Sequence, residues 1–464
     1  MFDIVLGLKR LKIPLIVFVV IAAAFIILSI FLTGDNIRRG VRIEDADVSW
    51  LDTNEARMLL TDSVNKSYAS GNFSLKYGSR VWKFGLDDIS YRFLVDDAVN
   101  KAFSVGRTGS IFSKVFTAAN LMINNLNLEI GTDYDSEKLV SILNNIKSEI
   151  DTKESNASLA YNSGNITLTK DKQGLQLDVD RSRKLVENHL RDRDFVGIEL
   201  AVDEINPLIA YKDIKDIDTV LSNFSTRFNA GDVNRSDNIR LACSRLNGRI
   251  LMPGDEFSMN ETLGPRTIEN GYKEAPVIFQ NELIKGPGGG ICQVTTTLYD
   301  AVLLAKLEIL ERSPHSMPLG YVKPGQDATI AEDSIDFRFD NSLDYPVCLS
   351  AEVVGSRINI RVLGRNSNDG NTVRLISDII AEYPPGADEI EIDDSLTDEQ
   401  MVVSKEARRG LRVVLYRDTY STDGVLIERE KISEDYYRPS KGLIKVNRNY
   451  YDNYLSAKKG LQNE

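Results

Sequence analysis

The sequence predicts a multidomain α+β protein that follows one N-terminal transmembrane helix. Three observations support this class: the chain has 464 residues, an early segment is apolar throughout, and helical and strand-like periodicities alternate after it. A single core rarely serves more than about 250 to 300 residues, so several domains are expected. A hydrophobic content of 42% and a charged content of 27% are typical of folded protein.

The charge and the cysteine content narrow the possible functions. The formal net charge is −12, and so acidic a chain repels the phosphate backbone, which argues against nucleic acid as a partner. The three cysteines, Cys243, Cys292 and Cys348, cannot form a disulfide framework. Cys292 and His315 have no companion ligands at zinc-type spacing, so neither a metal nor another cofactor is expected.

The apolar segment covers residues 13–32 and contains no charged residue. A helix of this length, at about 1.5 Å per residue, spans a hydrocarbon core of about 30 Å. A cleaved signal peptide is the alternative, but its apolar region is only about 7–15 residues long. The sequence therefore predicts a cytoplasmic N-terminus (1–12), lipid contact through one helix, and a single-pass cell-membrane protein with a C-terminal extracytoplasmic ectodomain.

Two segments of similar layout, residues 40–125 and 126–206, follow the apolar segment. Each contains a helix, a hairpin, and a strand that leads into a second helix. We interpret them as tandem α+β repeats that arose by internal duplication. They contain no plausible catalytic cluster, and His189 is expected at the surface. Binding or spacing is the function predicted for both repeats.

The chemistry is expected in a mixed α/β domain at residues 219–365. A glycine run ends directly before Cys292, and helical periodicity follows over residues 294–310. Cys292 is therefore placed at a helix N-terminus, where free N–H groups and the helix dipole favour a thiolate. The same N–H groups could stabilise an oxyanion. The candidates for oxyanion or substrate contacts at this loop are Gly289, Gly290 and Gln293.

His315 is the only histidine of this domain and is the candidate general base for Cys292. A cysteine followed by a histidine is the order found in papain-like and transglutaminase-like thiol enzymes. Asp327 could orient the imidazole, and Asp336 is its rival for that role. Arg338 lies on the same strand face as Asp336 and could bind a carboxylate.

Each candidate also has a structural interpretation. A lone cysteine is usually a buried small hydrophobic residue, which is the interpretation preferred for Cys243 and Cys348. Aspartates commonly cap turns, so Asp327 and Asp336 could be structural. Cys292 differs because it lies between a glycine run and a helix, which favours a catalytic role.

Four motifs together resemble the signature of the VanW family. They are GGGICQVTTTLYDA, ERSPHS, YVKPGQDATI and DFRFDN. The resemblance covers roughly residues 221–363, and the preceding repeats resemble the peptidoglycan-binding domains that often accompany it. The family is linked to glycopeptide resistance, and some members from anaerobic Gram-positive bacteria are L,D-transpeptidases with the motif cysteine as nucleophile. The resemblance implies the same role for Cys292.

The implied reaction builds cell wall. Cys292 would attack the third residue of a tetrapeptide stem, release the terminal D-alanine, and pass the thioester to the amine of a neighbouring stem. Water in place of the amine would give L,D-carboxypeptidase activity. The partners implied are stem peptides, as tetrapeptide donor and amine acceptor. The alternative is a non-catalytic peptidoglycan-binding or scaffold protein associated with wall synthesis or glycopeptide resistance.

Residues 366–450 are predicted to form a β-rich extension. Two alternating strands flank the turn sequence STDG, which starts at Ser421 and is typical of a hairpin. This segment resembles the C-terminal extension common in VanW proteins and is expected to pack against the catalytic domain. Residues 451–464 are polar and are predicted to form a flexible tail.

Overall fold

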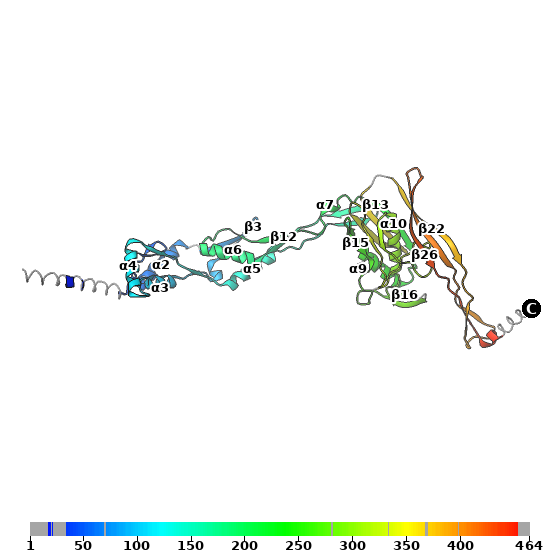
Figure 1. Cartoon of the computed structure of the whole chain (residues 1–464), viewed down its shortest axis with the longest axis horizontal. Helices are drawn as coiled ribbons and strands as arrows, with labels where there is room; N and C mark the ends of the chain where they lie inside the picture. Colours follow the sequence, from blue (N-terminus) through cyan, green and yellow to red (C-terminus); the bar gives the residue numbers. More distant parts are fainter. Residues whose placement is uncertain are drawn as a thin grey trace, which may run out of the picture. The chain divides into compact units, whose positions relative to one another are not determined.

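The computed structural model describes residues 17–19, 21, 34–68, 71–279, 282–332, 334–366, 370–397 and 399–452. The chain forms two compact units, one made of Met1–Glu154 and Gln173–Asn206, the other of Ser155–Lys172 and Pro207–Glu464. Both units combine helices with several small sheets, so the protein has a multidomain α+β fold (Figure 1).

The predicted transmembrane helix requires correction. Among the residues that the structure describes, no helix is long and apolar enough to cross a bilayer. Only residues 17–19 and 21 of the apolar segment are described, and the rest of that segment lies outside the described residues, as do residues 1–12. This finding contradicts the predicted single-pass membrane location.

The first unit contains five helices in its described part. The helix α2 begins at a capping box, in which Asp52 and Glu55 each accept a hydrogen bond from the other's backbone N–H. The helices are α2 (Thr53–Ser67), α3 (Val95–Ser104), α4 (Ile111–Ile123), α5 (Ser136–Ile150) and α6 (Val179–Asp192). The strands are β1 (Val41–Ile43), β2 (Ala46–Asp47), β3 (Asn72–Tyr77), β4 (Arg80–Gly85), β5 (Arg92–Phe93), β6 (Leu126–Leu128), β7 (Thr132–Asp133), β10 (Gly174–Leu177), β11 (Ile198–Glu199) and β12 (Val202–Ile205), with a 3-10 turn η1 (Leu86–Ile89).

Elements of the two predicted repeats interleave in this unit. Strand β1 pairs with β6, and β3 pairs with β11, both in parallel. One hydrophobic core accordingly joins Phe73 and Leu75 with Leu139 and Leu143. The division at residues 125 and 126 remains a prediction about the sequence. The fold combines both segments in one unit except for Ser155–Lys172, which belong to the other unit.

The second unit is built around a four-stranded sheet with the order β13-β21-β20-β14. Two helices, α8 and α10, share one hydrophobic core with this sheet and contribute Ile239, Val294, Leu298 and Val302 to it. The elements are β13 (Thr219–Arg227), α8 (Val233–Leu246), β14 (Arg249–Leu251), α10 (Ile291–Leu304), β20 (Val347–Val354) and β21 (Arg357–Gly364).

Smaller elements surround this core. They are the hairpin β8 (Ser158–Asn162) and β9 (Asn165–Thr169), the short helices α7 (Tyr211–Ile214) and α9 (Met259–Leu263), the hairpin β16 (Glu274–Phe279) and β17 (Glu282–Pro287), and a sheet of β15 (Glu256–Ser258), β19 (Arg338–Asp340) and β18 (Glu308–Glu311). The helix predicted over 294–310 is therefore too long. It ends at Leu304, because Lys306 has a left-handed backbone (φ 61°) and Ile309 lies in β18.

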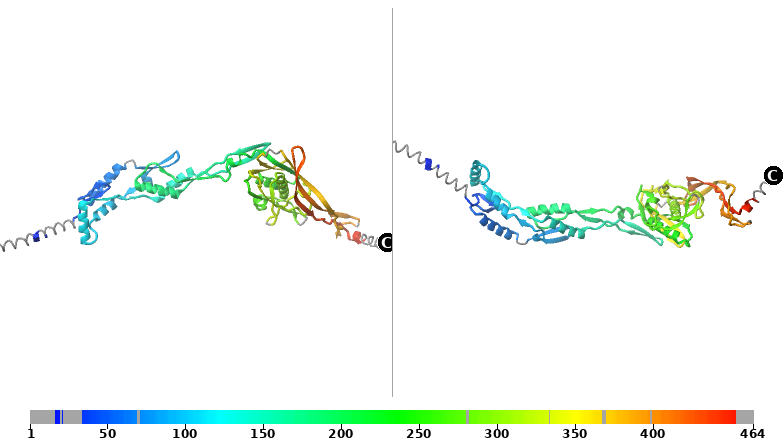
Figure 2. Two further views of the ribbon diagram at one scale, coloured as in Figure 1. Left: turned by 45° about the horizontal axis from the view of Figure 1, so that its top comes forward. Right: turned by 90° about the horizontal axis from the view of Figure 1, so that it is seen from below.

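The C-terminal segment consists of two three-stranded sheets (Figures 1 and 2). One contains β22 (Thr372–Tyr383), β25 (Gly410–Tyr420) and β26 (Leu426–Tyr437), and the other contains β23 (Glu389–Ile392), β27 (Leu443–Val446) and β24 (Met401–Lys405). The predicted hairpin is present, since β25 and β26 pair up to Tyr420 and Leu426. Leu415 of β25 belongs to the same core as α10. Residues 453–464 of the predicted tail lie outside the described residues.

Candidate functional site

The glycine run forms a tight turn directly before α10. Gly290 is the N-cap of the helix and has a φ of 104°, which a residue with a side chain rarely adopts. A Cβ atom at Gly289 would lie 2.6 Å from the carbonyl oxygen of Pro276 in β16. Only glycine therefore lets the turn pack against β16 and still leave Cys292 in the first turn of the helix.

A buried asparagine holds this turn in place. Asn238 of α8 donates hydrogen bonds to the carbonyl oxygens of Lys273 (2.8 Å) and Gly289 (3.1 Å), and it accepts one from the Lys273 N–H (2.7 Å). These bonds use the whole amide of Asn238 to join the turn to the start of β16. No sequence pattern around Asn238 indicated this role.

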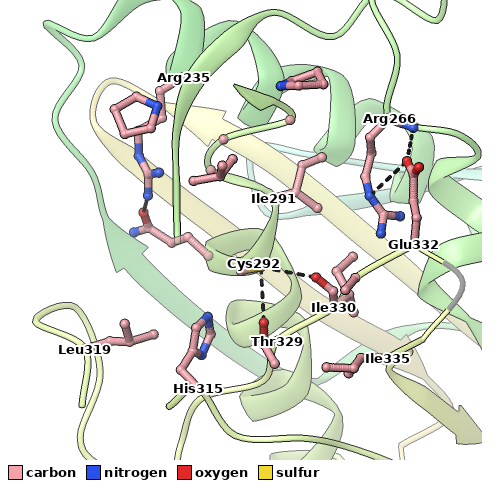
Figure 3. A pocket seen from close by; sticks show the side chains of 18 of the residues that line it. Arg235, Arg266, Ile291, Cys292, His315, Leu319, Thr329, Ile330, Glu332 and Ile335 are labelled. Atoms are coloured by element: carbon pink, nitrogen blue, oxygen red, sulfur yellow. Dashed lines mark hydrogen bonds and ion pairs between the residues drawn. The ribbon is translucent and has the colours of Figure 1, made fainter. Parts of the chain in front are cut away.

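Cys292 faces a pocket of about 1010 Å³. The pocket is lined by the glycine turn, by His315 and Thr329, and by two arginines, Arg235 and Arg266. Figure 3 shows Cys292 between the histidine and the loop that carries Thr329 and Ile330. The thiol Sγ lies 3.5 Å from Thr329 Oγ1 and 3.8 Å from the carbonyl oxygen of Ile330.

His315 and Asp327 are joined by two hydrogen bonds. The imidazole Nδ1 lies 2.8 Å from Asp327 Oδ2, and the backbone N–H of His315 donates to the same oxygen at 2.7 Å. A carboxylate can only accept, so Nδ1 carries the proton and Nε2 is the ring nitrogen available to the Cys292 thiol. Both His315 and Asp327 are buried, at 6% and 1% exposure.

The thiol and the imidazole favour each other's charged form. Burial raises the pKa of Cys292, but the interaction with His315 outweighs it and lowers that pKa to about 7. Burial lowers the pKa of His315, but Asp327 and Cys292 outweigh it and raise that pKa to about 9. Between these values a thiolate–imidazolium pair is the stable form. Burial alone acts on Cys243 and Cys348 and raises the pKa of each to about 12.

Asp327 is held from the C-terminal segment. Its Oδ1 accepts a hydrogen bond from the hydroxyl of Tyr437 at the end of β26, and its carbonyl oxygen accepts one from Arg312 Nε at 2.7 Å. Arg312 in turn binds both carboxylate oxygens of Asp435, at 2.6 and 2.7 Å. Burial raises the pKa of Asp327, but His315 and Arg312 outweigh it and keep the pKa lowered. The carboxylate thus stays charged beside the imidazole.

The structure brings some predicted residues together and leaves others outside. Cys292, His315 and Asp327 meet, and Gly289 and Gly290 form the turn beside them. Gln293 is buried, and its amide is fully committed: Nε2 donates to Arg227 O (2.7 Å) and Thr226 Oγ1 (3.2 Å), and Oε1 accepts from Arg235 (2.8 Å).

Asp336 and Arg338 lie outside the pocket lining. Asp336 accepts hydrogen bonds from the Ser258 hydroxyl and, at 2.9 Å, from the backbone N–H of Asn260, so it stabilises the start of α9. Arg338 forms an exposed ion pair with Glu256 at 2.6 Å. The residue that binds the imidazole is therefore Asp327, and the arginines near Cys292 are Arg235 and Arg266, which the sequence did not single out.

Within the described ranges, no group of three or more histidines, cysteines, aspartates and glutamates could hold a metal ion.

Comparison with protein families matches three parts of the chain. The model for VanW-like proteins matches residues 234–363, the model described as "Putative peptidoglycan binding domain" matches residues 82–197, and the G5 domain model matches residues 380–447. The first match contains Cys292, His315 and Asp327, and the last contains Asp435 and Tyr437.

Two curated proteins resemble the chain in part. The uncharacterized protein YoaR of Bacillus subtilis (strain 168) is 41% identical over 140 residues, which are 30% of this chain and 46% of that protein. The vancomycin B-type resistance protein VanW of Enterococcus faecalis (strain ATCC 700802 / V583) is 31% identical over 135 residues, which are 28% of this chain and 49% of that protein. The chain thus spans about half the length of the curated relatives it matches.

Two solved G5 domains also match a short part of the chain. The G5 domain of IgA1 protease is 18% identical and covers 18% of this chain and 96% of its own, with a TM-score of 0.12. The G5 domain of HP0197 is 21% identical and covers 17% of this chain and 95% of its own, with a TM-score of 0.11. The family matches together indicate a cell-wall-associated protein with a VanW-like domain at residues 234–363, beside the peptidoglycan-binding and G5 domain matches.

Proposed function

We propose that the protein is an L,D-transpeptidase of the cell wall that uses Cys292 as its nucleophile. The observation that carries this proposal is the arrangement of Cys292 and His315 on the wall of one pocket, with Asp327 bound to the imidazole and the cysteine in the first turn of α10. A thiolate beside an imidazolium that a carboxylate orients is suited to acyl transfer. A cysteine that only filled space would lack these partners, as Cys243 and Cys348 do.

The reaction has two steps. The thiolate Sγ of Cys292 attacks the carbonyl carbon of the third residue of a tetrapeptide stem, and the bond to the terminal D-alanine breaks. His315 gives its Nε2 proton to the leaving amine, so a thioester and free D-alanine result. The side-chain amine of a neighbouring stem then attacks the thioester and gives a proton back to His315. An amide forms and the Cys292 thiolate returns.

The negative charge on the attacked oxygen needs donors near the thiol. The backbone N–H of Cys292 is in the first turn of α10 and has no hydrogen-bond acceptor among the described residues. A free N–H at the positive end of a helix suits an oxyanion. The side chain of Gln293 is less suited, because both of its N–H groups already have acceptors.

The other domain matches support the choice of substrate. The peptidoglycan-binding model matches residues 82–197, and a binding unit on the same chain would keep the pocket close to stem peptides. When water replaces the acceptor amine, the same thioester gives L,D-carboxypeptidase activity.

A second candidate is a non-catalytic wall-binding or scaffold protein. The matches to peptidoglycan-binding and G5 domains favour it, because both parts of the chain could bind without any reaction at Cys292. The two candidates differ in the expected reactivity of the thiol. The first requires a thiolate at neutral pH, and the second does not.

Mass spectrometry of muropeptides separates these candidates. The full chain is incubated with purified tetrapeptide-bearing disaccharides, beside Cys292→Ala and the matched control Cys243→Ala, which removes a buried thiol outside the pocket. We expect dimers linked through third-position residues with the wild type and with Cys243→Ala, and none with Cys292→Ala. Neither dimers nor trimmed stems from the wild type, or undiminished dimers from Cys292→Ala, would overturn the proposal.

A further inference from the structure

Arg266 has an unusual environment for an arginine that lines a pocket. Its side chain is only 10% exposed, its Nη1 donates to Asn260 Oδ1 at 2.8 Å, and its Nε lies 3.5 Å from Glu332. The remaining nitrogen, Nη2, is buried and has no hydrogen-bond partner among the described residues. Burial of a donor without an acceptor is unfavourable, so this nitrogen is suited to a ligand that supplies one.

The position of Arg266 connects it to the reactive thiol. A Cβ atom at Gly288 would lie 3.4 Å from the Cβ of Arg266, so the arginine packs against the turn that leads into Cys292. Figure 3 shows its guanidinium group directed toward Ile330, whose carbonyl oxygen is a contact of the thiol. The donor therefore lies on the wall of the pocket that contains the nucleophile.

A second arginine flanks the same turn. A Cβ atom at Gly290 would lie 3.1 Å from Arg235 Cγ, and the Arg235 guanidinium is fixed by Gln293 Oε1 at 2.8 Å. Glu332 is the one carboxylate among the described lining residues, against two arginines and the protonated His315. The charge of His315 is offset by Asp327, so the argument rests on the two arginines, which outnumber the carboxylate of Glu332 on the pocket wall and favour an anionic ligand there.

We propose that Arg266, assisted by Arg235, binds a carboxylate of the substrate and so selects acyl donors that end in a free acid. The planar guanidinium fork matches the two oxygens of a carboxylate. The inference rests on the proposed function, in which D-alanine follows the attacked carbonyl and carries the terminal carboxylate one residue away. Arg266 and Arg235 are specificity-determining residues in this account, and the stem carries other carboxylates that the same donors could bind.

Peptide binding without turnover tests this inference. The Cys292→Ala chain is titrated with a stem tetrapeptide ending in D-alanine and with its C-terminal carboxamide, and the dissociation constants are measured by calorimetry. We expect the acid to bind at least about tenfold more tightly, the range of one lost charged hydrogen bond. Equal binding of acid and carboxamide would overturn the assignment of the terminal carboxylate.

Arginine variants locate the source of the preference. In the Cys292→Ala background, Arg266→Gln should abolish the preference for the acid. Arg266→Lys keeps the charge without the fork and should retain part of it. Arg338→Gln, which removes an exposed arginine outside the pocket, should leave it intact. An undiminished preference in Arg266→Gln, or its loss in Arg338→Gln, would contradict the inference.

Alkylation gives a second test that needs no peptide. Iodoacetate and iodoacetamide react with the Cys292 thiolate in the same way, forming a bond from Sγ to carbon and releasing iodide, but only iodoacetate is an anion. The rate with iodoacetate divided by the rate with iodoacetamide should fall several-fold in Arg266→Gln and stay unchanged in Arg338→Gln. An unchanged ratio in Arg266→Gln would overturn the inference.

The two proposals fail in different ways. Acid-selective binding with no cross-linked or trimmed product would refute the transpeptidase and leave the carboxylate site standing. Cross-linking by a chain that binds acid and carboxamide alike would refute the carboxylate site and leave the transpeptidase standing.

Discussion

The two histidines of the chain each pair with an aspartate, one in each unit, and the pairs differ in their surroundings. His189 at the end of α6 lies 3.0 Å from Asp194, and their side chains are 37% and 59% exposed. His315 lies 2.8 Å from Asp327, and their side chains are 5% and 2% exposed. The bond is the same in both units. The burial and the neighbours of the pair are what differ.

The neighbours decide what each pair can do. Asp194 makes a further long contact of 3.5 Å with the backbone N–H of Val196, and exposed ion pairs contribute little to stability. Asp327 is fixed by Tyr437 and Arg312, and its histidine faces a thiol. A His–Asp pair therefore becomes a candidate catalytic element only where the fold buries it and places a nucleophile beside it.

The largest expected effect is the loss of the imidazole beside Cys292. His315→Asn should reduce transfer by about 10²- to 10⁴-fold, because proton transfer to the leaving amine and formation of the thiolate both depend on it. His189→Asn, its matched control in the other unit, should leave the rate unchanged. Turnover of a tetrapeptide followed by mass spectrometry measures both. Equal rates in the two variants would contradict the account.

Substitution of Asp327 should lower the rate of transfer, and substitution of Asp194 should not. Asp327→Asn should lower the rate by about 10²-fold, the lower end of what acid–base catalysis contributes, because the amide no longer fixes the imidazolium. Asp194→Asn should not change the rate. The same turnover assay applies, and circular dichroism checks that each variant is folded. Full activity of a folded Asp327→Asn protein would show that the carboxylate does not position His315.

The contribution of the C-terminal segment is expected to be smaller. Tyr437→Phe removes the hydrogen bond to Asp327 and the acceptor for the N–H of Gly325, so the free energy of unfolding should fall by about 1–3 kcal/mol. The neighbouring Tyr436 is 51% exposed, and Tyr436→Phe should have little effect. Urea unfolding compares the two variants. A Tyr437→Phe protein as stable as the wild type would mean that this bond is dispensable.

The smallest expected change is a shift in pH dependence. Since the pKa of Cys292 is about 7 and that of His315 is about 9, transfer should rise through pH 7 as the thiol ionises and fall through pH 9 as the imidazolium loses its proton. In His315→Asn the alkylation midpoint of Cys292 should move up to the ordinary thiol value of about 8.5 or above it, because burial then acts on the thiol without the imidazole. In His189→Asn it should not move. A midpoint unaffected by His315→Asn would mean that the imidazole does not influence the ionisation of the Cys292 thiol.

The sequence indicated the local part of the site and little of its long-range part. Cys292 could be placed at a helix N-terminus, because the glycine run and the periodicity after it are local signals. The end of that helix could not be placed. Residues 308–311 have an apolar pattern that suits a helix or a strand, and their pairing with β19 makes them β18.

The choice between Asp327 and Asp336 depended on long-range packing. The two aspartates are nine positions apart in the sequence, and nothing local shows that Asp336 binds the start of α9 instead of the imidazole. Tyr437 is 110 residues from Asp327, and Arg235 is 58 residues from Gln293. Partners this far apart in sequence meet only in the folded chain, so Arg235 and Tyr437 could not be identified from the sequence pattern alone.

Trapping the acyl-enzyme tests directly whether Cys292 is the nucleophile. The full chain is mixed with tetrapeptide in the absence of an acceptor amine, quenched with acid, and examined by intact-mass and peptide-level mass spectrometry. We expect a tripeptide acyl group on Cys292, absent in Cys292→Ala and strongly reduced in His315→Asn. An acyl group on another residue, or D-alanine release that Cys292→Ala does not diminish, would contradict the assignment of Cys292 as the nucleophile.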